Sequence, residues 1–402
     1  MLPSGAMKKA VVVLLAFVFL APVASPAAER VRVPQHVLDA IVDPDPNPLP
    51  RYATAEELAL PPLDLPAVLL APPAGVVDTP SEYAHNEGVL FTWRSYTSLI
   101  TAMTVEITNR DPDGTVYIVV SSASQQASAT NTLSGAGADM SRVDFILAAT
   151  DTVWIRDYGP RFISVDGERA IVDHTYNRPR PNDNQIPDHV AALWSEASYD
   201  IGLRHGGGNF HLFDDDAYMT ELILDENSGL SEAEVEQRYL DYQGLDLTIT
   251  DPLPSWFDST QHIDMWMLPA ADREVIIGEY ASGTTAHTVT ETWAAELTSR
   301  GYTVHRTPGW SSGAHYTYTN AVIFNEMVFV PEYTGYTTEN DQAIAIFETA
   351  FPGRTIIPVN CSGIIGAAGA IHCITMHVPD VEAIFVNGFE AGTTGMWDDT
   401  AQ

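Results

Sequence analysis

Short apolar runs alternate with amphipathic segments along most of the chain from Glu82 onward. Runs of four to eight β-branched or apolar residues bounded by Gly, Pro or Asp are typical of buried strands, and apolar residues three or four positions apart are typical of helices. We predict strands over 88–93, 116–121, 143–148, 170–175, 219–224, 275–278, 321–324 and 327–330, and helices over 97–109, 189–198, 289–299 and 341–351. Another helix is expected after Ser231, because Ser231-x-x-Glu234 has the form of a capping box.

This succession of strands and helices returns about every 50–60 residues, in spacing rather than in sequence identity. It predicts a closed α/β domain of pseudo-repeated ββαβ-like modules. An open doubly wound sheet would produce the same alternation, so the pattern alone does not choose between the two architectures.

The first 28 residues have the layout of a secretory signal peptide. Lys8-Lys9 precede an apolar stretch over 10–21, and small residues follow around a plausible cleavage point in 22–28. The apolar stretch is shorter than the roughly 18 residues that cross a bilayer, which disfavours the alternative of an N-terminal membrane anchor. We therefore expect a secreted or periplasmic protein without stable membrane insertion.

Residues 29–77 are rich in proline and are predicted to form an extended leader rather than a folded unit. Acidic residues alternate with prolines over 43–48, but the prolines and the missing glycine disfavour a calcium loop. The catalytic domain is expected over 78–380. A short tail over 381–402 receives no assigned chemistry.

Composition and charge narrow the classes of function. A hydrophobic fraction of 45% is enough for a packed core, which excludes wholesale disorder. The net charge of −34 repels phosphate backbones and anionic headgroups, so nucleic acid is not an expected partner. Cationic small molecules and basic peptides are attracted instead. Lysine occurs only as Lys8 and Lys9, so the basic residues of the mature chain are arginines.

Two cysteines, Cys361 and Cys373, lie twelve positions apart. In an exported protein a disulfide between them is the ordinary interpretation. No H-E-x-x-H or C-x-x-C motif accompanies them, so the sequence offers no recognisable zinc site. The surroundings of Cys373 favour another use, described below.

Four segments could carry chemistry, although each is weak alone. Trp154-Ile155-Arg156-Asp157 before a Gly-Pro turn could be only a buried ion pair, and His262-Ile263-Asp264 is a pairing that arises often by chance. Small residues precede Cys373 in Gly369-Ala370-Ile371-His372-Cys373, and Gly206-Gly207-Gly208-Asn209 exposes backbone. A fifth candidate, Gly309-Trp310-Ser311-Ser312-Gly313, matches the nucleophile elbow of α/β-hydrolases, but Pro308 precedes it and strand-like residues follow it.

Together these segments resemble the guanidine-modifying deiminases, in the branch that holds agmatine deiminases and Porphyromonas-type bacterial peptidylarginine deiminases. The resemblance covers roughly residues 80–379. It rests on ordered blocks: Trp154 to Pro160, His262 to Met265, Tyr318-Thr319-Asn320 with Val330-Pro331, Asp341 with Phe351-Pro352-Gly353-Arg354, and Gly369 to Thr375. The resemblance implies a pentein-type α/β propeller of ββαβ modules around a central active site.

Two details bear on whether the chain is more similar to the agmatine deiminases or to the Porphyromonas-type peptidylarginine deiminases. Agmatine deiminases carry a glutamate just before the paired glycines, and this chain has Gly206 there. The segment Asn177-Arg178-Pro179-Arg180-Pro181 resembles the clamp for the carboxylate of a C-terminal arginine, because two arginines form a fork matched to a carboxylate. The alternative is that these arginines pair with local acids such as Asp183. Ser259 stands where the family is expected to have an aromatic residue that lines the outer end of the substrate. The resemblance therefore does not define how that end is bound.

The resemblance also implies roles. Asp157 and Asp264 would hold the guanidinium, Cys373 would be the nucleophile with a pKa lowered by nearby positive charge, and His262 would transfer protons. Substrate binding would involve Asn320, Arg178, Arg180, Trp154, Gly208 and Asn209. No cofactor or metal follows from these residues. The product would be citrulline from peptidyl-arginine; agmatine as substrate and an inactive deiminase-like binding protein are the alternatives. The oligomeric state stays open.

Overall fold

The same module of strands recurs in five sheets. The computed structural model describes residues 33–380, and in each sheet of this part an antiparallel pair is extended by a parallel pair. The sheets are β1-β5-β6-β7 (Val77–Asp78, Arg161–Val165, Glu168–Tyr176, Ala197–His205), β8-β9-β10 (His211–Leu212, Asp216–Thr220, Asp246–Thr250), β11-β12-β13-β14 (Met267–Ala271, Glu274–Glu279, Thr303–Ser311, His315–Thr317), β15-β16-β17 (Val322–Phe324, Met327–Glu332, Thr355–Asn360) and β18-β2-β3-β4 (Met376–Pro379, Asn86–Thr92, Thr115–Val120, Val143–Leu147).

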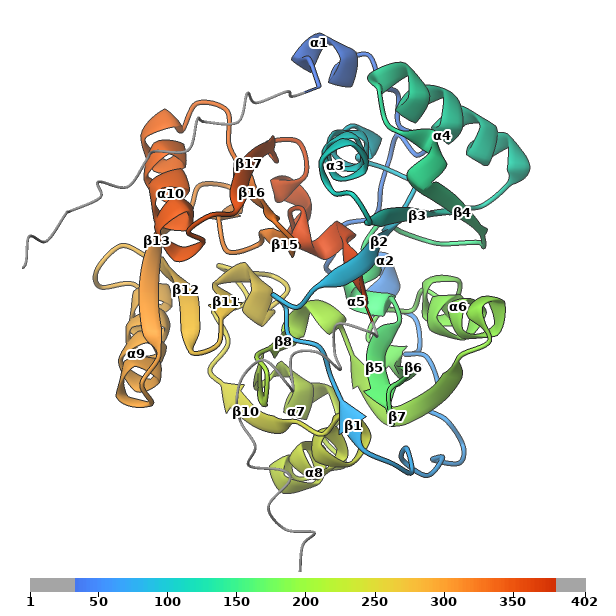
Figure 1. Ribbon diagram of the computed structural model, residues 1–402. Coiled ribbons are helices and arrows are strands. Elements are labelled where there is room, and N and C mark those ends of the chain that lie inside the picture. Colours follow the sequence, from blue (N-terminus) through green and yellow to red (C-terminus); the bar gives the residue numbers. More distant parts are fainter. Residues whose placement is uncertain (1–32, 381–402) are drawn as a thin grey trace, which may run out of the picture. The chain divides into compact units, whose positions relative to one another are not determined.

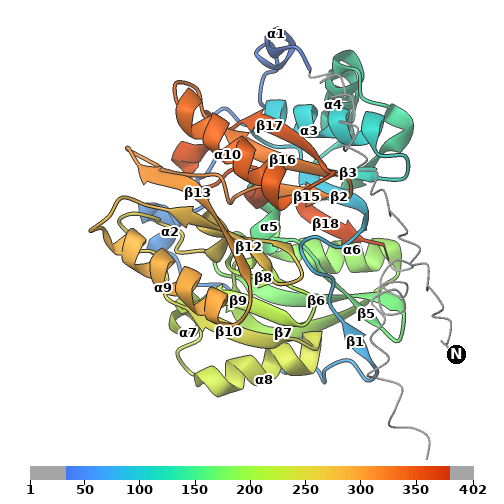
Figure 2. The same cartoon turned by 60° about the vertical axis from the view of Figure 1, so that its left-hand side comes forward.

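Helices make the crossovers between the parallel strands, as parallel pairing requires. They are α3 (Thr97–Arg110), α4 (Ala123–Ala136), α6 (Ile186–Trp194), α7 with α8 (Leu222–Glu226, Glu232–Gln243), α9 (Thr285–Ser299) and α10 (Thr337–Ala350). Figure 1 shows the five sheets in turn along the chain, and Figure 2 shows α8, α9 and α10 on the outer side of their sheets. The predicted ββαβ module is therefore observed as a continuous segment in four sheets of the described chain, and in the fifth β18 from the end of the domain joins β2, α3 and β3.

The two ends of the catalytic domain meet in one sheet. The last strand, β18, pairs antiparallel with β2, with Met376 opposite Leu90 and His377 opposite Val89. This pairing fixes the segment that ends in Cys373 against the start of the domain. The fold is α/β, and the closed propeller arrangement of its modules stays a prediction.

Most predicted elements are confirmed with boundaries shifted by a few residues, and the capping box at Ser231 and Glu234 is present. Two predictions were wrong at their ends. The helix expected to Ser198 ends at Trp194, because Ser195 adopts a left-handed conformation and the chain enters β7. The strand expected to Leu224 ends at Thr220, and α7 begins at Leu222. Helix α4 was not predicted, because only Ala129 and Leu133 on it are buried and it lacks an apolar stripe.

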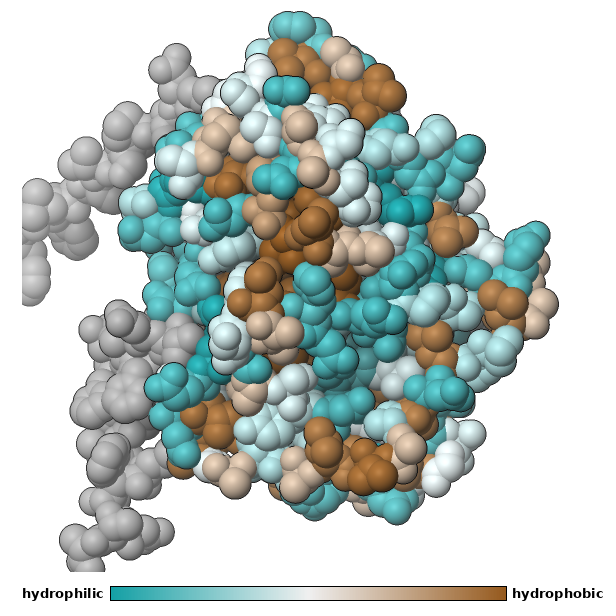
Figure 3. Space-filling view, turned by 90° about the vertical axis from the view of Figure 1, so that its right-hand side faces the viewer, coloured by the Kyte–Doolittle hydropathy of each residue, from teal (hydrophilic) through white to brown (hydrophobic). Residues whose placement is uncertain are grey.

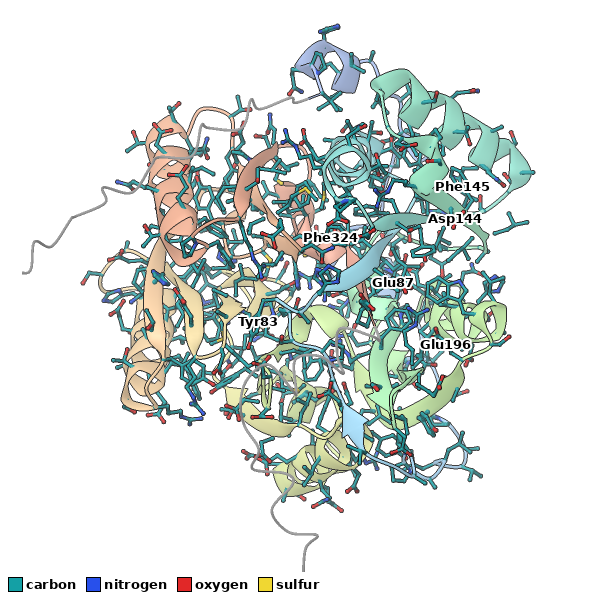
Figure 4. The ribbon with its side chains drawn as sticks, viewed as in Figure 1. Tyr83, Glu87, Asp144, Phe145, Glu196 and Phe324 are labelled. Carbon is teal, nitrogen blue, oxygen red and sulfur yellow. The ribbon has the colours of Figure 1, made fainter. Side chains whose placement is uncertain are left out.

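The largest apolar core lies between the β2-β3-β4 and β15-β16-β17 sheets and reaches the segment of Cys373. A charged contact adds to the packing between neighbouring sheets: Arg169 of β6 binds Glu87 of β2 and Glu196, two of the residues labelled in Figure 4. The same guanidinium lies over the rings of Phe162 and Trp194. Such contacts hold two modules in a fixed relation.

The proline-rich leader packs on the catalytic domain. Two helices of one turn, α1 (Gln35–Leu38) and α2 (Ala55–Leu58), interrupt an otherwise irregular path. A further short helix, α5 (Ile155–Tyr158), belongs to the catalytic domain. The leader was expected to be extended; it is largely so, but it reaches the interior at Arg51, which is fully buried. The predicted signal peptide and C-terminal tail lie outside the described residues. Within 33–380, none of the helices has the length and apolarity needed to cross a bilayer.

Candidate active site

Short segments at the ends of strands bring the predicted residues together. Asp157 lies in α5, Gly208 in the 3-10 helix η3 (Gly207–Asn209), Asp264 in η4 (Ile263–Met265) and Cys373 in η6 (His372–Ile374). Helix α5 contacts η3 and η6, and η3 contacts η4. Residues that are more than 200 positions apart in sequence therefore share one buried site.

The guanidinium of Arg51, from the leader, occupies the centre of this site. Its Nε and Nη2 donate to the two carboxylate oxygens of Asp157 at 2.9 and 2.8 Å. Its Nη1 and Nη2 donate to the two oxygens of Asp264, both at 3.0 Å. Each carboxylate thus makes a paired contact with one guanidinium, the geometry that gives such contacts their strength and direction.

His262 approaches the same guanidinium. Its Nδ1 lies 2.7 Å from Nη2 of Arg51 and 3.5 Å from Oδ1 of Asp157. Its Nε2 is buried and has no hydrogen-bond partner among the described residues. One nitrogen of the guanidinium, Nη2, therefore faces an imidazole as well as both carboxylates.

Cys373 completes the cluster. Its Sγ lies 3.6 Å from Oδ2 of Asp264, the oxygen that also binds Arg51, and 3.1 Å from Nδ2 of Asn320. Gly369 makes room for this sulfur, since a Cβ at position 369 would lie 2.8 Å from Sγ and 2.8 Å from the ring of Trp154. The small residue before the cysteine is thus required by packing around the sulfur itself.

Charge pairing decides the ionisation of the two carboxylates. Burial acts to raise the pKa of Asp157, but the charge of Arg51 and the contact with His262 outweigh it and hold this pKa well below its usual value. The pKa of Asp264 is also lowered against burial, by Arg51 and by His372, whose Nδ1 lies 2.9 Å from Oδ2. Both carboxylates are therefore ionised and able to hold a cation.

Burial dominates at the other two groups. It raises the pKa of Cys373 well above that of a free thiol; Arg51 acts in the opposite direction, and the two carboxylates add to the rise. Burial and Arg51 lower the pKa of His262, so its imidazole is neutral. The expected lowering of the thiol pKa by nearby positive charge is not found with Arg51 in the site, because desolvation of the thiolate outweighs the guanidinium.

The predicted arginine fork contacts the leader. Arg178 Nε donates to the carbonyl oxygen of Arg51 at 3.2 Å. Arg180 is buried and binds the carboxylate of Glu57 at 2.7 Å, together with the carbonyl oxygens of Pro50 at 2.7 Å and Tyr52 at 3.3 Å. Trp154 Nε1 donates to the carbonyl of Leu49 at 2.9 Å. The alternative that these arginines pair with acids is thus observed, although not with Asp183: Arg180 pairs with Glu57, and Arg178 lies 4.0 Å from Glu226.

The glycine segment shapes the seat of the guanidinium. A Cβ at Gly208 would lie 1.6 Å from Nη2 of Arg51, and the amide of Gly208 donates to Asp157 at 3.0 Å. Gly206 lies beside His262, since a Cβ there would be 2.9 Å from its ring. Asn209, predicted to bind substrate, has its Oδ1 engaged with the amides of Thr220 and Ile263 instead. It therefore fixes η3 to η4 and does not contact Arg51.

A second buried cluster lies beside the first. Glu82, His211 and His372 present ligand atoms within 4.8 Å of one another, a set of groups that suits a divalent metal. Arg156 also contacts Glu82, at 3.4 Å, and His377 lies 3.6 Å from it. A guanidinium already compensates this carboxylate, so the cluster fits a network of ion pairs better than a metal site.

Two further predictions can be compared with the structure. Both cysteines are free and buried, so the disulfide that is the ordinary interpretation of such a pair is not observed between Cys361 and Cys373. The Gly309–Gly313 motif lies in strand β13 and the turn that follows, where Ser311 pairs with His315 of β14. It is not a strand–turn–helix elbow.

Sequence reasoning missed Arg51, Glu57 and His372 as members of the site. The signal for Arg51 was faint: one arginine between Pro50 and Tyr52 in a chain otherwise poor in basic residues.

The surface hollow between β4 and α6, on the face seen in Figure 3, is lined by Leu147, Ala148, Ile186 and His189 among others. It contains none of the residues of the site.

Comparison with known families gives the context of this geometry. The family model of the Porphyromonas-type peptidyl-arginine deiminases matches residues 79–379. The chain belongs to this family. As a member of the Porphyromonas-type deiminase family, it is a hydrolase of the class that acts on C–N bonds of guanidines.

Other members of this group are similar over the same region. A Streptomyces avermitilis protein provisionally named an agmatine deiminase is 28% identical over 281 residues, which are 59% of this chain and 77% of that protein. The agmatine deiminase structures of C. jejuni (16% identity) and Enterococcus faecalis (20% identity) align with TM-scores of 0.65 and 0.66. Each alignment covers 76% of this chain and 96% of the other, which shows the shared pentein fold.

Proposed function

We propose that this deiminase converts arginine in peptides, preferably at the C-terminus, to citrulline and ammonia. One observation carries the proposal: the side chain of Arg51, an arginine within a polypeptide, is bound by the groups that the family resemblance assigns to substrate. The carbonyl oxygen of the same residue is contacted by Arg178. The site therefore has groups for both ends of a peptidyl arginine.

The preference for a C-terminal residue follows from that carbonyl contact. If a substrate arginine binds as Arg51 does, the α-carboxylate of a C-terminal arginine lies where Arg178 Nε meets the carbonyl oxygen at 3.2 Å. A carboxylate accepts from a guanidinium more strongly than a neutral carbonyl does. Arg180 already binds a carboxylate, that of Glu57. This contact supports the proposal that Arg178 and Arg180 bind the α-carboxylate of a substrate.

In the proposed reaction the carboxylates of Asp157 and Asp264 hold the substrate guanidinium in place. The sulfur of Cys373 forms a bond to the central carbon of the guanidinium, which becomes tetrahedral. The thiol proton of Cys373 passes to the neutral imidazole of His262 as this bond forms, and His262 then supplies a proton to the nitrogen in the position of Nη2, its nearest neighbour at 2.7 Å. The carbon–nitrogen bond then breaks, ammonia leaves, and a covalent thiouronium remains on Cys373.

Water completes the cycle. His262 accepts a proton from a water molecule, whose oxygen attacks the thiouronium carbon, and the carbon–sulfur bond breaks to give the ureido group of citrulline. Asn320, 3.1 Å from Sγ, orients the sulfur in both steps. The charge of a bound guanidinium acts to lower the pKa of Cys373, as that of Arg51 does, although burial outweighs it and the thiol remains protonated until its proton passes to His262.

Agmatine is the second candidate substrate, favoured by the names of the similar proteins from Streptomyces and Yersinia. Agmatine has the guanidinium but no carboxylate or carbonyl for Arg178. Gly206, in place of a glutamate, also argues against it. The inactive binding protein is the third candidate, and the assembled site of Asp157, Asp264, His262 and Cys373 argues against it.

Export and architecture complete the proposal. We infer a secreted or periplasmic protein from the signal-like segment over 1–28, and a closed ring of the five ββαβ modules around the site. The strand pairing of β18 with β2 supports the second inference.

The deciding experiment measures ureido product and ammonia from a dipeptide ending in arginine, from its amide and from agmatine. It uses the full chain and its Arg51→Ala variant, because Arg51 fills the site. We expect the highest kcat/KM for the free-acid peptide and no turnover by Cys373→Ser. If agmatine is the best substrate, the proposed activity on peptidyl-arginine is wrong and the enzyme is an agmatine deiminase. Turnover by Cys373→Ser would contradict the proposed role of Cys373 as the nucleophile.

A further inference from the structure

The leader precedes the family match, which begins at residue 79. Nevertheless its Arg51 is one of the largest fully buried side chains of the described protein. Burying a guanidinium is costly unless charges compensate it, and here both carboxylates of the candidate site do so. The burial of Arg51 therefore depends on the groups that would bind substrate.

The leader is held on both sides of Arg51. Before it, Asp43 accepts from the amides of Tyr96 and Thr97 at the start of α3, and Asp45 pairs with Arg94 at 3.3 Å. At Arg51 itself, the amide donates to the carbonyl of Ala367 at 3.0 Å. These contacts use main chain and side chains of the catalytic domain, so the path of the leader is specific.

After Arg51, the leader is anchored by two more arginines of the domain. Glu57 binds Arg180 and also forms the capping box of α2 with Thr54. Arg204 Nη2 donates to the carbonyl of Leu63 at 2.7 Å. The burial of Glu57 acts to raise its pKa, but the bonds from Arg180 and Thr54 lower it, so this anchor is a charged pair.

We propose that residues 43–63 are an internal inhibitor in which Arg51 imitates the substrate, so that the enzyme is latent until the leader is displaced or cleaved. This inference rests on the proposed function, because it assigns the regulation of the same site. A tethered ligand competes at an effective concentration that can reach the millimolar range, which a free substrate must overcome. Displacement would also free Arg178 and Arg180 for the substrate.

The docked leader is arranged to persist rather than to be consumed. Cys373 is fully buried while Arg51 occupies the site, so a competing ligand reaches the sulfur only after Arg51 has left. The anchors at Asp43 and Leu63 hold the chain on both sides of Arg51 and oppose its departure. Release therefore requires a change in the leader itself.

The first test measures access to Cys373 without relying on turnover. The probe is 2-chloroacetamidine, a small amidinium cation that two carboxylates can hold while the thiolate displaces chloride. The rate of alkylation at Cys373 is followed by mass spectrometry in the wild-type chain and in Arg51→Ala. We expect alkylation to be on the order of tenfold faster, or more, in the variant, because the competing guanidinium is removed.

Leu58→Ala is the matched control, since Leu58 lies in the same leader and is 75% exposed. It should react like the wild type. Should Arg51→Ala fail to fold because two buried carboxylates lose their partner, Glu57→Ala decides, since it loosens the leader and leaves Arg51 present. We expect faster alkylation in Glu57→Ala as well. Equal rates in the wild type and in the folded variant would overturn the inference.

The second test separates this inference from the proposed function. Turnover of the arginine dipeptide is measured in the same proteins. Faster alkylation in Arg51→Ala with no turnover of any guanidine would leave the leader as an inhibitor and overturn the deiminase proposal. Equal alkylation rates in the wild type and in Arg51→Ala, together with turnover by the wild type, would overturn the inhibitor inference and leave the deiminase proposal standing. Conversion of Arg51 to citrulline in the wild type, a gain of about 1 Da, would also overturn latency, because the leader would then be a substrate.

Discussion

The amide Nδ2 of Asn320 lies 3.1 Å from Sγ of Cys373, and Oδ1 of the same amide accepts a hydrogen bond from the amide of Ala370 at 2.9 Å. The hydrogen bond from Ala370 fixes the orientation of the side-chain amide and so keeps Nδ2 directed at Sγ. Asn320 also accepts from the amide of His372 through its own carbonyl, at 3.2 Å. One side chain therefore ties the segment before Cys373 to the sulfur and presents an N–H donor to it.

Replacing Asn320 by aspartate should slow catalysis. The size is unchanged, but a carboxylate replaces the N–H donor beside the sulfur and opposes formation of the thiolate. We expect kcat for an arginine dipeptide to fall by about a hundredfold, as for other single donors to a developing anion. The pH at which Cys373 becomes reactive should rise. Asn360→Asp, at a partly exposed position bonded to Thr334 and Ser362, is the control and should change neither quantity.

Gly208→Ala should exclude any guanidinium from the site. The added Cβ would lie 1.6 Å from the position of Arg51 Nη2 and under 3 Å from the oxygens of Asp157 and Asp264. We expect kcat/KM to fall by roughly a hundredfold or more, through binding as well as chemistry. Gly366→Ala is the matched control, because nothing lies within 4 Å of a Cβ there. Wild-type kcat/KM in Gly208→Ala would show that substrates bind in a different place from Arg51.

The fold and the centre of the site could be predicted from the sequence to different degrees. Strands such as β2 and β16 bury nearly every residue and stand out as apolar runs. Helix α4 does not, because its stability comes from Ser122 capping and from two buried residues only. Asp157, Asp264, His262 and Cys373 stood in recognisable ordered blocks, so their meeting in one site could be anticipated.

Arg51 could not be predicted in the same way. Nothing local to the segment around Pro50 distinguishes a buried arginine from an exposed one, because its partners lie 106 and 213 positions away. The contacts of Arg178 and Arg180 depend on that insertion and were missed with it. Long-range charge pairing leaves no periodic trace in a sequence, unlike the burial of a strand or helix face.

Glu226 should make stability depend on pH. Burial raises its pKa from 4.5 to about 7, although Arg178 and Asn177 act in the opposite direction. A carboxyl group whose pKa is higher in the folded chain binds more protons when folded, so the free energy of unfolding falls as pH rises between these two values. The loss reaches at most about 3.5 kcal/mol above pH 7, because each pH step of one between the two pKa values lowers the free energy of unfolding by about 1.4 kcal/mol.

Glu226→Gln should remove this dependence. At pH 5 the neutral glutamate and glutamine should give similar unfolding free energies in urea, whereas at pH 8 the variant should be more stable than the wild type. Glu221→Gln, at the exposed position before α7, is the control and should differ from the wild type by the same amount at both pH values. A difference between Glu226→Gln and wild type that is equal at both pH values would contradict the assignment.

Arg178→Ala should remove the preference for a free C-terminal arginine. Arg178 Nε contacts the carbonyl oxygen of Arg51, so it is the group that would meet the α-carboxylate of a bound substrate. Losing a charge-assisted hydrogen bond costs about 1.5–3 kcal/mol, which corresponds to roughly ten- to a hundredfold in kcat/KM. The loss should apply to the free-acid dipeptide and should be smaller for its amide and absent for agmatine, since agmatine has no group at this position. Arg238→Ala is the control, because the guanidinium of Arg238 donates hydrogen bonds to the main-chain carbonyls of Ile201 and Gly202. An equal loss for all three substrates would mean that Arg178 acts on the shape of the site, through Glu226 or the segment of Asn177, rather than on the carboxylate.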